Sequence, residues 1–327
     1  MDDFFIHPFS KSISESRVLM AIPIIDLHCD ALLRMYEHGY DFRNAESLDV
    51  NLPRLRTGHV RAQAFAIFVM PNWSTEKKLK AALHQVYYFQ NQVVNKSENV
   101  VHIKEWSDFD HLKPDEIGAF LTIEGVDFFE GDLKMWHLFK SFGVLAIGLT
   151  WNFPNEAADG LDSMLRRGVT AFGREIIALN NTHKILTDVT HLSEHSFWHC
   201  IEYADYVIAT HSNAKAVCNH KRNLSDAQLR AMIVKNAPIH LVYFPEFTTG
   251  TNQATLGDLM KHVDHICALG GKHLIGIGSD FDGINHKITG LENAGQHQHF
   301  INELLKHYSE VDVRGFAYEN FLRNRPL

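Results

Sequence analysis

Eight short apolar segments, each followed by a segment of helical or polar character, constrain the fold of this 327-residue chain more than any other feature. The segments are rich in Val, Ile, Leu, Phe and Ala and mostly lack strict polar alternation, which is typical of strands buried on both faces of a parallel sheet. They cover residues 22–28, 62–70, 118–124, 144–151, 184–191, 206–211, 238–244 and 273–280. This order predicts an α/β protein built on parallel strands.

The segments between the apolar runs carry signals for helices. Ser74, Ser193 and Ser225 each stand at the start of a stretch with helical character, where a serine is a suitable N-cap. Helical periodicity also covers residues 256–269, and two glycines end it. Eight strand–helix units favour a (β/α)8 TIM barrel of the metal-dependent hydrolase type. A doubly wound open sheet is the alternative, but the chain has neither a Gly-x-Gly-x-x-Gly motif after the first strand nor a phosphate-binding loop.

Composition and charge limit the class of protein. Hydrophobic residues make up 45% and charged residues 21% of the chain, values that are typical of a globular domain. The formal net charge is -8 and no Lys/Arg-rich block occurs, so a nucleic-acid partner is not expected. No stretch approaches the ~20 apolar residues of a membrane span, and the N-terminus lacks the apolar core of a signal peptide. We expect a cytoplasmic protein without a membrane partner, with an N-terminal extension at 1–21 and a single barrel domain at 22–327.

Metal-capable side chains end most of the predicted strands. Since the loops that follow the strands form the active-site face of a TIM barrel, we expect these side chains to converge. Imidazole and carboxylate groups are ligands for zinc and also for Mn, Fe and Co, whereas the four scattered cysteines lack the Cys-x-x-Cys spacing of a cysteine zinc site. The residues are His28 and Asp30 after the first strand, Glu124 after the third, His191 after the fifth, His211 after the sixth and Asp280 after the eighth.

The number of these ligands favours two metal ions over one. A single ion needs only three or four protein ligands, and this set offers five candidates plus Asp280. Glu124 is suited to bridge two ions because its carboxylate has two oxygens. Two divalent ions ~3.5–4 Å apart lower the pKa of a shared water from 15.7 toward ~7. The sequence therefore predicts a binuclear hydrolytic site.

Five motifs, in order, resemble the renal (membrane) dipeptidase family of zinc peptidases, peptidase family M19, of the amidohydrolase-like superfamily. The resemblance runs from about residue 22 to about residue 322 and thus covers nearly the whole chain. Each motif alone is weak, but their common order at strand ends is specific. The motifs are His28-Cys-Asp30, Glu124-Gly, His191, His211-Ser followed by Lys221-Arg222-Asn223, and Gly278-Ser279-Asp280-Phe281-Asp282-Gly283.

The resemblance implies a ligand set for each of two zinc ions. His28, Asp30 and Glu124 would hold one ion, and Glu124, His191 and His211 would hold the other. Family members accept dipeptides with a C-terminal D-residue and are commonly dimers, which implies a dipeptide substrate and a homodimer.

The resemblance also implies roles for residues that contact the substrate. Arg222 would bind the substrate carboxylate, and Asp280 would handle a proton near the bridging water. At Trp151 the mammalian branch of the family has a His that contacts the substrate, whereas an indole N–H can donate a hydrogen bond but cannot accept one or carry charge. Trp151 and the adjacent Asn152 are therefore candidate residues of a substrate pocket that differs from the family pattern.

Together these features predict a binuclear zinc dipeptidase in which a metal-bridging hydroxide attacks the peptide carbonyl. Glu124 and Asp280 are the predicted catalytic residues. One alternative is an amidohydrolase with the same kind of site that acts on N-acyl amino acids, lactams or lactones. Another alternative is a non-catalytic metal-binding barrel.

Overall fold

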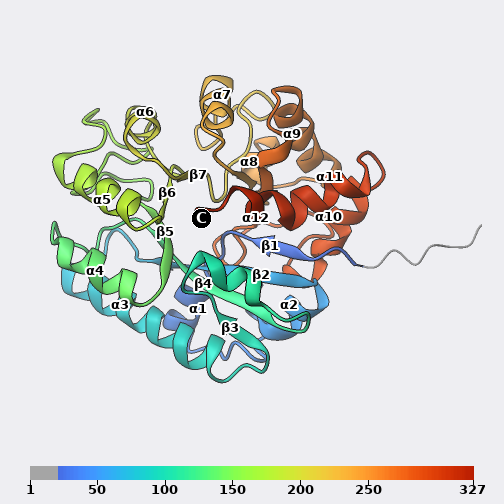
Figure 1. Ribbon diagram of the computed structural model, residues 1–327, viewed down its shortest axis with the longest axis horizontal. Coiled ribbons are helices and arrows are strands. Elements are labelled where there is room, and N and C mark those ends of the chain that lie inside the picture. Colours follow the sequence, from blue (N-terminus) through green and yellow to red (C-terminus); the bar gives the residue numbers. More distant parts are fainter. Residues whose placement is uncertain (1–20) are drawn as a thin grey trace, which may run out of the picture.

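Eight parallel strands form a nearly closed ring in the computed structural model, which describes residues 21–327. The last strand of the ring pairs with the first, and a parallel bridge between Ala209 and Ile239 joins the end of the sixth strand to the seventh. The predicted (β/α)8 barrel is confirmed, and Figure 1 shows helices around the ring. The ring strands are β1 (Ile24–Asp26), β2 (Val60–Phe68), β4 (Ile117–Glu124), β5 (Val144–Gly148), β6 (Leu186–Asp188), β7 (Val207–Ile208), β8 (Ile239–Leu241) and β9 (Ile275–Ile277).

Each predicted apolar segment overlaps one ring strand, and only β2 and β4 begin before their segments, by two residues and one residue. Every position of β4 and all but one position of β2 are buried, as expected for strands covered on both faces. A further strand, β3 (Val100–His102), was not predicted and pairs with β4 outside the ring. Three residues are too few to show a periodic pattern, so no strand was expected between the helix that follows Ser74 and β4.

Helices cover the outside of the ring. Ser74, Ser193 and Ser225 are confirmed as N-caps, since each side-chain oxygen accepts a hydrogen bond from a backbone N–H in the first turn. The α-helices are α1 (Ala31–His38), α2 (Leu52–Thr57), α3 (Thr75–Tyr88), α4 (Leu133–Ser141), α5 (Ala171–Thr182), α6 (Glu194–Tyr203), α7 (Asp226–Val234), α8 (Pro245–Thr249), α9 (Leu256–Ala268), α10 (His297–Leu304), α11 (Glu310–Arg314) and α12 (Asn320–Asn324). Shorter 3-10 and π-helical turns are η1 (Phe89–Val94), η2 (Trp106–His111), η3 (Lys272–Leu274), η4 (Ala294–Gln296) and η5 (Gly315–Glu319).

Aromatic side chains fill one end of the barrel. Phe321 of α12 packs against Phe109 and Phe120, with ring centroids 5.6 and 6.4 Å apart. Phe120 lies in the first half of β4, so this cluster occupies the end of the barrel at which the strands begin. Figure 1 shows α12 across the middle of the ring. The candidate functional site lies at the opposite end of the barrel, where the strands finish.

Two further predictions concern the N-terminal residues and membrane-spanning segments. The predicted extension at 1–21 falls outside the described residues except for its last position, so the division of the chain into an extension and one domain stays a prediction. Within residues 21–327, no helix has both the length and the apolar character needed to cross a bilayer.

Candidate active site

The predicted ligands meet where the ring strands finish. One of them ends β4, three lie three residues beyond the ends of β6, β7 and β9, and two follow β1. Their side chains are almost fully buried, the most exposed being 14% accessible. The six residues are Glu124, His191, His211, Asp280, His28 and Asp30.

Two of these residues have an uncommon backbone conformation. His191 and Asp280 have φ values of 68° and 64°, in the left-handed region that residues other than glycine rarely adopt. The Asp280 N–H donates a hydrogen bond to the carbonyl of His28 at 3.1 Å, and the Asp30 N–H donates one to the carbonyl of Phe281 at 2.9 Å. These bonds tie the loop after β1 to the loop after β9, so the ligands of the two loops are held in one arrangement.

The Glu124 carboxylate lies between the imidazole rings. Its Oε1 is 2.8 Å from Nε2 of His191 and 3.6 Å from Nε2 of His211. Its Oε2 is 3.7 Å from Nε2 of His28. The two oxygens of one carboxylate thus face different imidazoles, which is the arrangement that a bridging ligand requires.

A second group of ligand atoms surrounds His28. Its Nε2 is 3.5 Å from Oδ2 of Asp30 and 3.7 Å from Oδ1 of Asp280. The Nε2 of His28 and Oδ1 of Asp30 are buried and have no hydrogen-bond partner among residues 21–327. Buried polar atoms are normally satisfied, so these two free ligand atoms fit the binding of a cation. The donor set of imidazoles and carboxylates suits a divalent metal ion.

The electrostatics of the site also favour a cation. Burial raises the pKa of Glu124 well above its usual range and that of Asp280 to about 7. Burial alone would lower the pKa of His28, but the neighbouring carboxylates, foremost Glu124, raise it to about 10. Burial lowers the pKa of His191 and His211, so both imidazoles are neutral and have lone pairs for a metal.

A buried carboxylate that was not predicted fixes the ends of β1 and β9. Asp26, the last residue of β1, accepts hydrogen bonds from Ser279 N–H at 2.8 Å and Ser279 O–H at 2.6 Å. It also accepts a longer bond from the His28 N–H at 3.3 Å. Because Ser279 directly precedes Asp280, Asp26 holds the backbone next to two of the candidate ligands.

Asp188 repeats this arrangement on the other side of the barrel. It is the last residue of β6 and accepts hydrogen bonds from the Thr190 N–H at 3.0 Å, the Thr210 N–H at 3.0 Å and the Thr210 O–H at 2.5 Å. Thr210 directly precedes His211, so the ends of β6 and β7 are joined beneath the candidate ligands. A sequence signal for both residues exists: an aspartate inside an apolar segment, two or three positions before a histidine, at 26 and 188.

The other ring nitrogens of two histidines also have partners. Nδ1 of His191 is 2.7 Å from Oδ1 of Asn152, and Nδ1 of His211 is 3.0 Å from Oγ1 of Thr210. Such contacts fix the ring orientation and direct Nε2 toward the site. Asn152, predicted as a substrate-pocket residue, therefore also orients a candidate ligand.

A cavity of about 560 Å³ opens onto the candidate ligands and is called the metal pocket below. Trp151 lines this pocket, with its ring centroid 5.4 Å from that of Phe68 and 5.9 Å from that of His191. Phe244, Phe247 and Ile284 extend the apolar wall. Trp151 thus stands between an apolar surface and the candidate ligands.

Arg222 brings a buried positive charge to the same place. It is 5% exposed, and its Nη2 lies 3.1 Å from the carbonyl oxygen of His211 and 3.2 Å from Nε2 of His191. Its Nε has no hydrogen-bond partner within the described part of the chain. Burial lowers the pKa of Arg222 to about 10, so the guanidinium stays charged at neutral pH. A buried guanidinium with a free donor is suited to bind an anion such as a carboxylate.

Comparison with known proteins agrees with this geometry. The model of the membrane dipeptidase family, peptidase family M19, matches residues 13–325. Dipeptidase aclJ of Aspergillus oryzae is 27% identical over 335 residues, which cover 94% of this chain and 78% of that protein. A metallopeptidase of Rhodobacter sphaeroides, solved with a phosphinate mimic of the dipeptide L-Ala-D-Ala, has a TM-score of 0.87 at 24% identity and covers 94% of this chain and 100% of that one. A solved family M19 metallopeptidase, dipeptidase AC, has a TM-score of 0.87 at 25% identity, with 93% and 98% coverage.

Proposed function

The chain belongs to the membrane dipeptidase family, peptidase family M19, and we propose that it is a binuclear zinc dipeptidase whose substrates include dipeptides with a C-terminal D-residue. Membership of this family makes the protein a metallopeptidase that acts on dipeptides. The observation that carries the finer proposal is the position of Glu124, whose Oε1 faces His191 and His211 while its Oε2 faces His28.

The proposed ligand sets share Glu124. His28, Asp30 and Glu124 would hold one ion, and Glu124, His191 and His211 would hold the other. The free buried atoms of His28 and Asp30 support the first set. When bound, two such ions supply an activated water at neutral pH and polarise the peptide carbonyl.

Asp280 and Arg222 both line the metal pocket and would act on different groups of the substrate. Asp280 lines the pocket with its Oδ1 3.7 Å from Nε2 of His28, where its carboxylate can take up a proton and pass it to the leaving amine. Arg222 would grip the C-terminal carboxylate through two parallel hydrogen bonds. Because Arg222 lies only 3.2 Å from His191, a substrate held there has room for about one residue beyond the cleaved bond, which restricts the enzyme to dipeptides.

The stereochemistry of the first substrate to test comes from a relative. The Rhodobacter sphaeroides structure holds a mimic of L-Ala-D-Ala, so L-Ala-D-Ala is the natural first probe. Trp151 offers an apolar wall at this pocket, and packing rather than hydrogen bonding is its proposed contribution.

Metal analysis combined with a substrate panel tests the proposal. We expect two equivalents of zinc per chain, hydrolysis of L-Ala-D-Ala, loss of activity with a chelator and recovery with zinc. One equivalent at full activity would contradict the binuclear site. Hydrolysis of N-acyl amino acids, lactams or lactones without hydrolysis of any dipeptide would contradict the proposed substrate class. Unchanged turnover in R222A would contradict the role of Arg222.

A further inference from the structure

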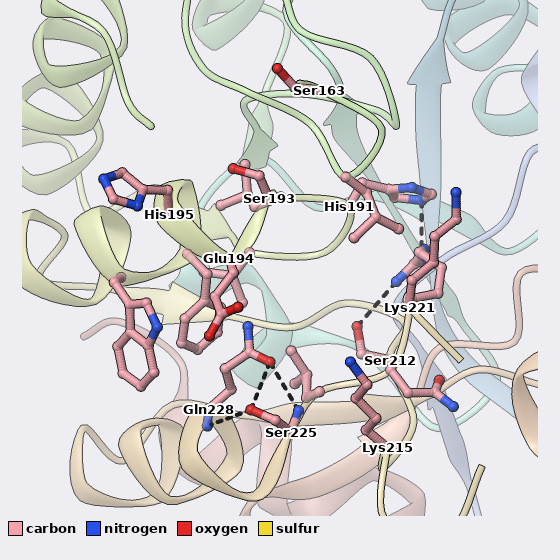
Figure 2. A pocket seen from close by; sticks show the side chains of 18 of the residues that line it. Ser163, His191, Ser193, Glu194, His195, Ser212, Lys215, Lys221, Ser225 and Gln228 are labelled. Carbon is pink, nitrogen blue, oxygen red and sulfur yellow. Dashed lines mark hydrogen bonds between the residues drawn. The ribbon is translucent and has the colours of Figure 1, made fainter. Parts of the chain in front are cut away.

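A second cavity of about 690 Å³ adjoins the metal pocket and has no role in the function proposed above. The two cavities share Leu161, His191, Lys221 and Arg222, so they meet at the buried guanidinium. We call the second one the α6–α7 cavity, because the N-terminal ends of both helices line it. Figure 2 shows Ser193, Glu194 and His195 on one side of it, Ser212, Lys215 and Lys221 on the other, and Ser225 and Gln228 below.

The side chains that line the two cavities differ in the sign of their net charge. In the metal pocket, six carboxylates outnumber three cationic side chains, whereas in the α6–α7 cavity four cationic side chains face one carboxylate. The carboxylates of the metal pocket are Asp30, Glu37, Glu124, Glu246, Asp280 and Asp282, and its cations are Arg34, Lys221 and Arg222. The charged residues of the α6–α7 cavity are Arg166, Lys215, Lys221, Arg222 and Glu194.

Lys215 and Arg166 are the cations of the α6–α7 cavity that have no ion-pair partner among residues 21–327, and Lys215 is the more buried of the two. Lys221 pairs with Asp162, and Arg222 is assigned to the main-chain carboxylate of the substrate. Lys215 is half-buried and has no carboxylate within ion-pair distance in the part of the chain that the structure describes. The helix dipoles of α6 and α7 add to the positive potential, since both N-caps, Ser193 and Ser225, line the cavity.

We propose that the α6–α7 cavity binds the side chain of the C-terminal residue of the dipeptide and favours an acidic side chain there. This inference rests on the proposed function, because Arg222 must hold the main-chain carboxylate. With that carboxylate at the junction of the cavities and the cleaved bond at the candidate metal ligands, the amino terminus lies in the metal pocket and the C-terminal side chain lies toward Lys215. A cavity of this size is within the range of ligand sites, ~300–1,000 Å³, and far exceeds the methyl group of alanine.

The test compares L-Ala-D-Glu with L-Ala-D-Gln, which has nearly the same shape but no side-chain charge. We expect kcat/KM to be about tenfold higher for the glutamate substrate, and higher salt to reduce this ratio. In K215M, which keeps the length of the side chain and removes its charge, the ratio should fall by at least about threefold. The matched control is K235M at the C-terminal end of α7, outside the cavity lining, where the ratio should stay at the wild-type value.

Several outcomes would overturn the inference. These are equal kcat/KM for the two substrates in the wild type, an unchanged ratio in K215M, or a stronger preference for glutamate at the N-terminal position than at the C-terminal position. Thermal melting of K215M against K235M shows whether the fold is retained, and binding of free D-glutamate against D-glutamine to the zinc-loaded protein provides a second measure of the same preference. Hydrolysis of L-Ala-D-Ala without any preference for acid would overturn this inference alone, whereas no hydrolysis of any dipeptide would overturn the proposed function as well.

Discussion

Replacing Gly283 by alanine should weaken metal binding and slow the reaction without unfolding the protein. A Cβ atom at Gly283 would lie 2.2 Å from Oδ2 of Asp30 and 2.6 Å from Oδ1 of Asp280. Gly283 is not among the glycines with positive φ, so its backbone accepts alanine without strain. The substitution therefore acts on two side-chain ends, both of which belong to the candidate site.

The size of the effect follows from these distances. An ordinary contact needs at least 3.4 Å, so the carboxylate oxygens of Asp30 and Asp280 must move by about 1 Å. A zinc–oxygen bond is about 2.0–2.2 Å long, and a shift of that size breaks it. A misplacement of about 1 Å costs about 10²-fold in rate, or about 2.7 kcal/mol of transition-state stabilisation. The free energy of unfolding should change by less than about 1 kcal/mol, because only the ends of side chains are displaced.

Three measurements on G283A check this reasoning: zinc content, kcat/KM for L-Ala-D-Ala and thermal melting. G257A is the matched control, because a Cβ at Gly257 in α9 would meet only Oγ1 of Thr255 at 3.7 Å. Alanine favours a helix over glycine by about 1 kcal/mol, so G257A should keep its metal and melt at the same or a higher temperature. Full zinc content and full activity in G283A would refute the argument, and so would unfolding of G283A.

Three further predictions concern parts around the site. D188N places an amide donor against the Thr210 hydroxyl, which donates to Asp188 in the wild type. Zinc affinity, measured in competition with a chelator, should fall about 10- to 100-fold. Unchanged affinity would show that Asp188 does not position the candidate ligands. F321A removes a buried ring from the aromatic cluster at the start of the strands and should lower the free energy of unfolding, measured with urea, by about 3–5 kcal/mol. The folded variant should keep its zinc stoichiometry. A decrease below about 1 kcal/mol would show that Phe321 of α12 does not stabilise this end of the barrel. Burial lowers the pKa of His262 to about 4, below its usual 6.5, so the imidazole is neutral in the folded protein at neutral pH. Between pH 6.5 and 4 the unfolded chain binds a proton at His262 that the folded protein does not bind. The free energy of unfolding should therefore fall by up to about 3 kcal/mol over this range. In H262Q this part of the pH dependence of unfolding should be absent, and an unchanged slope would contradict it.

Features that depend on neighbouring residues could be predicted from the sequence. The ring strands follow from apolar segments, and the N-caps at Ser193 and Ser225 follow from the hydrogen bond of a serine to its own helix turn. The convergence of His28, Glu124 and His211 follows from the geometry of a barrel, in which every parallel strand finishes at the same end. Local periodicity and strand direction were enough for these features.

Features that depend on packing between distant segments were decided only by the tertiary structure. Asp26 and Ser279 are 253 residues apart, and nothing near either position in the chain shows that their side chains meet. The contact that a Cβ at Gly283 would make with Asp30 is of the same kind, and so is the meeting of the two cavities at Arg222. Such contacts arise from how side chains of separate loops fill the same space, and a periodic pattern in the sequence carries no information about that.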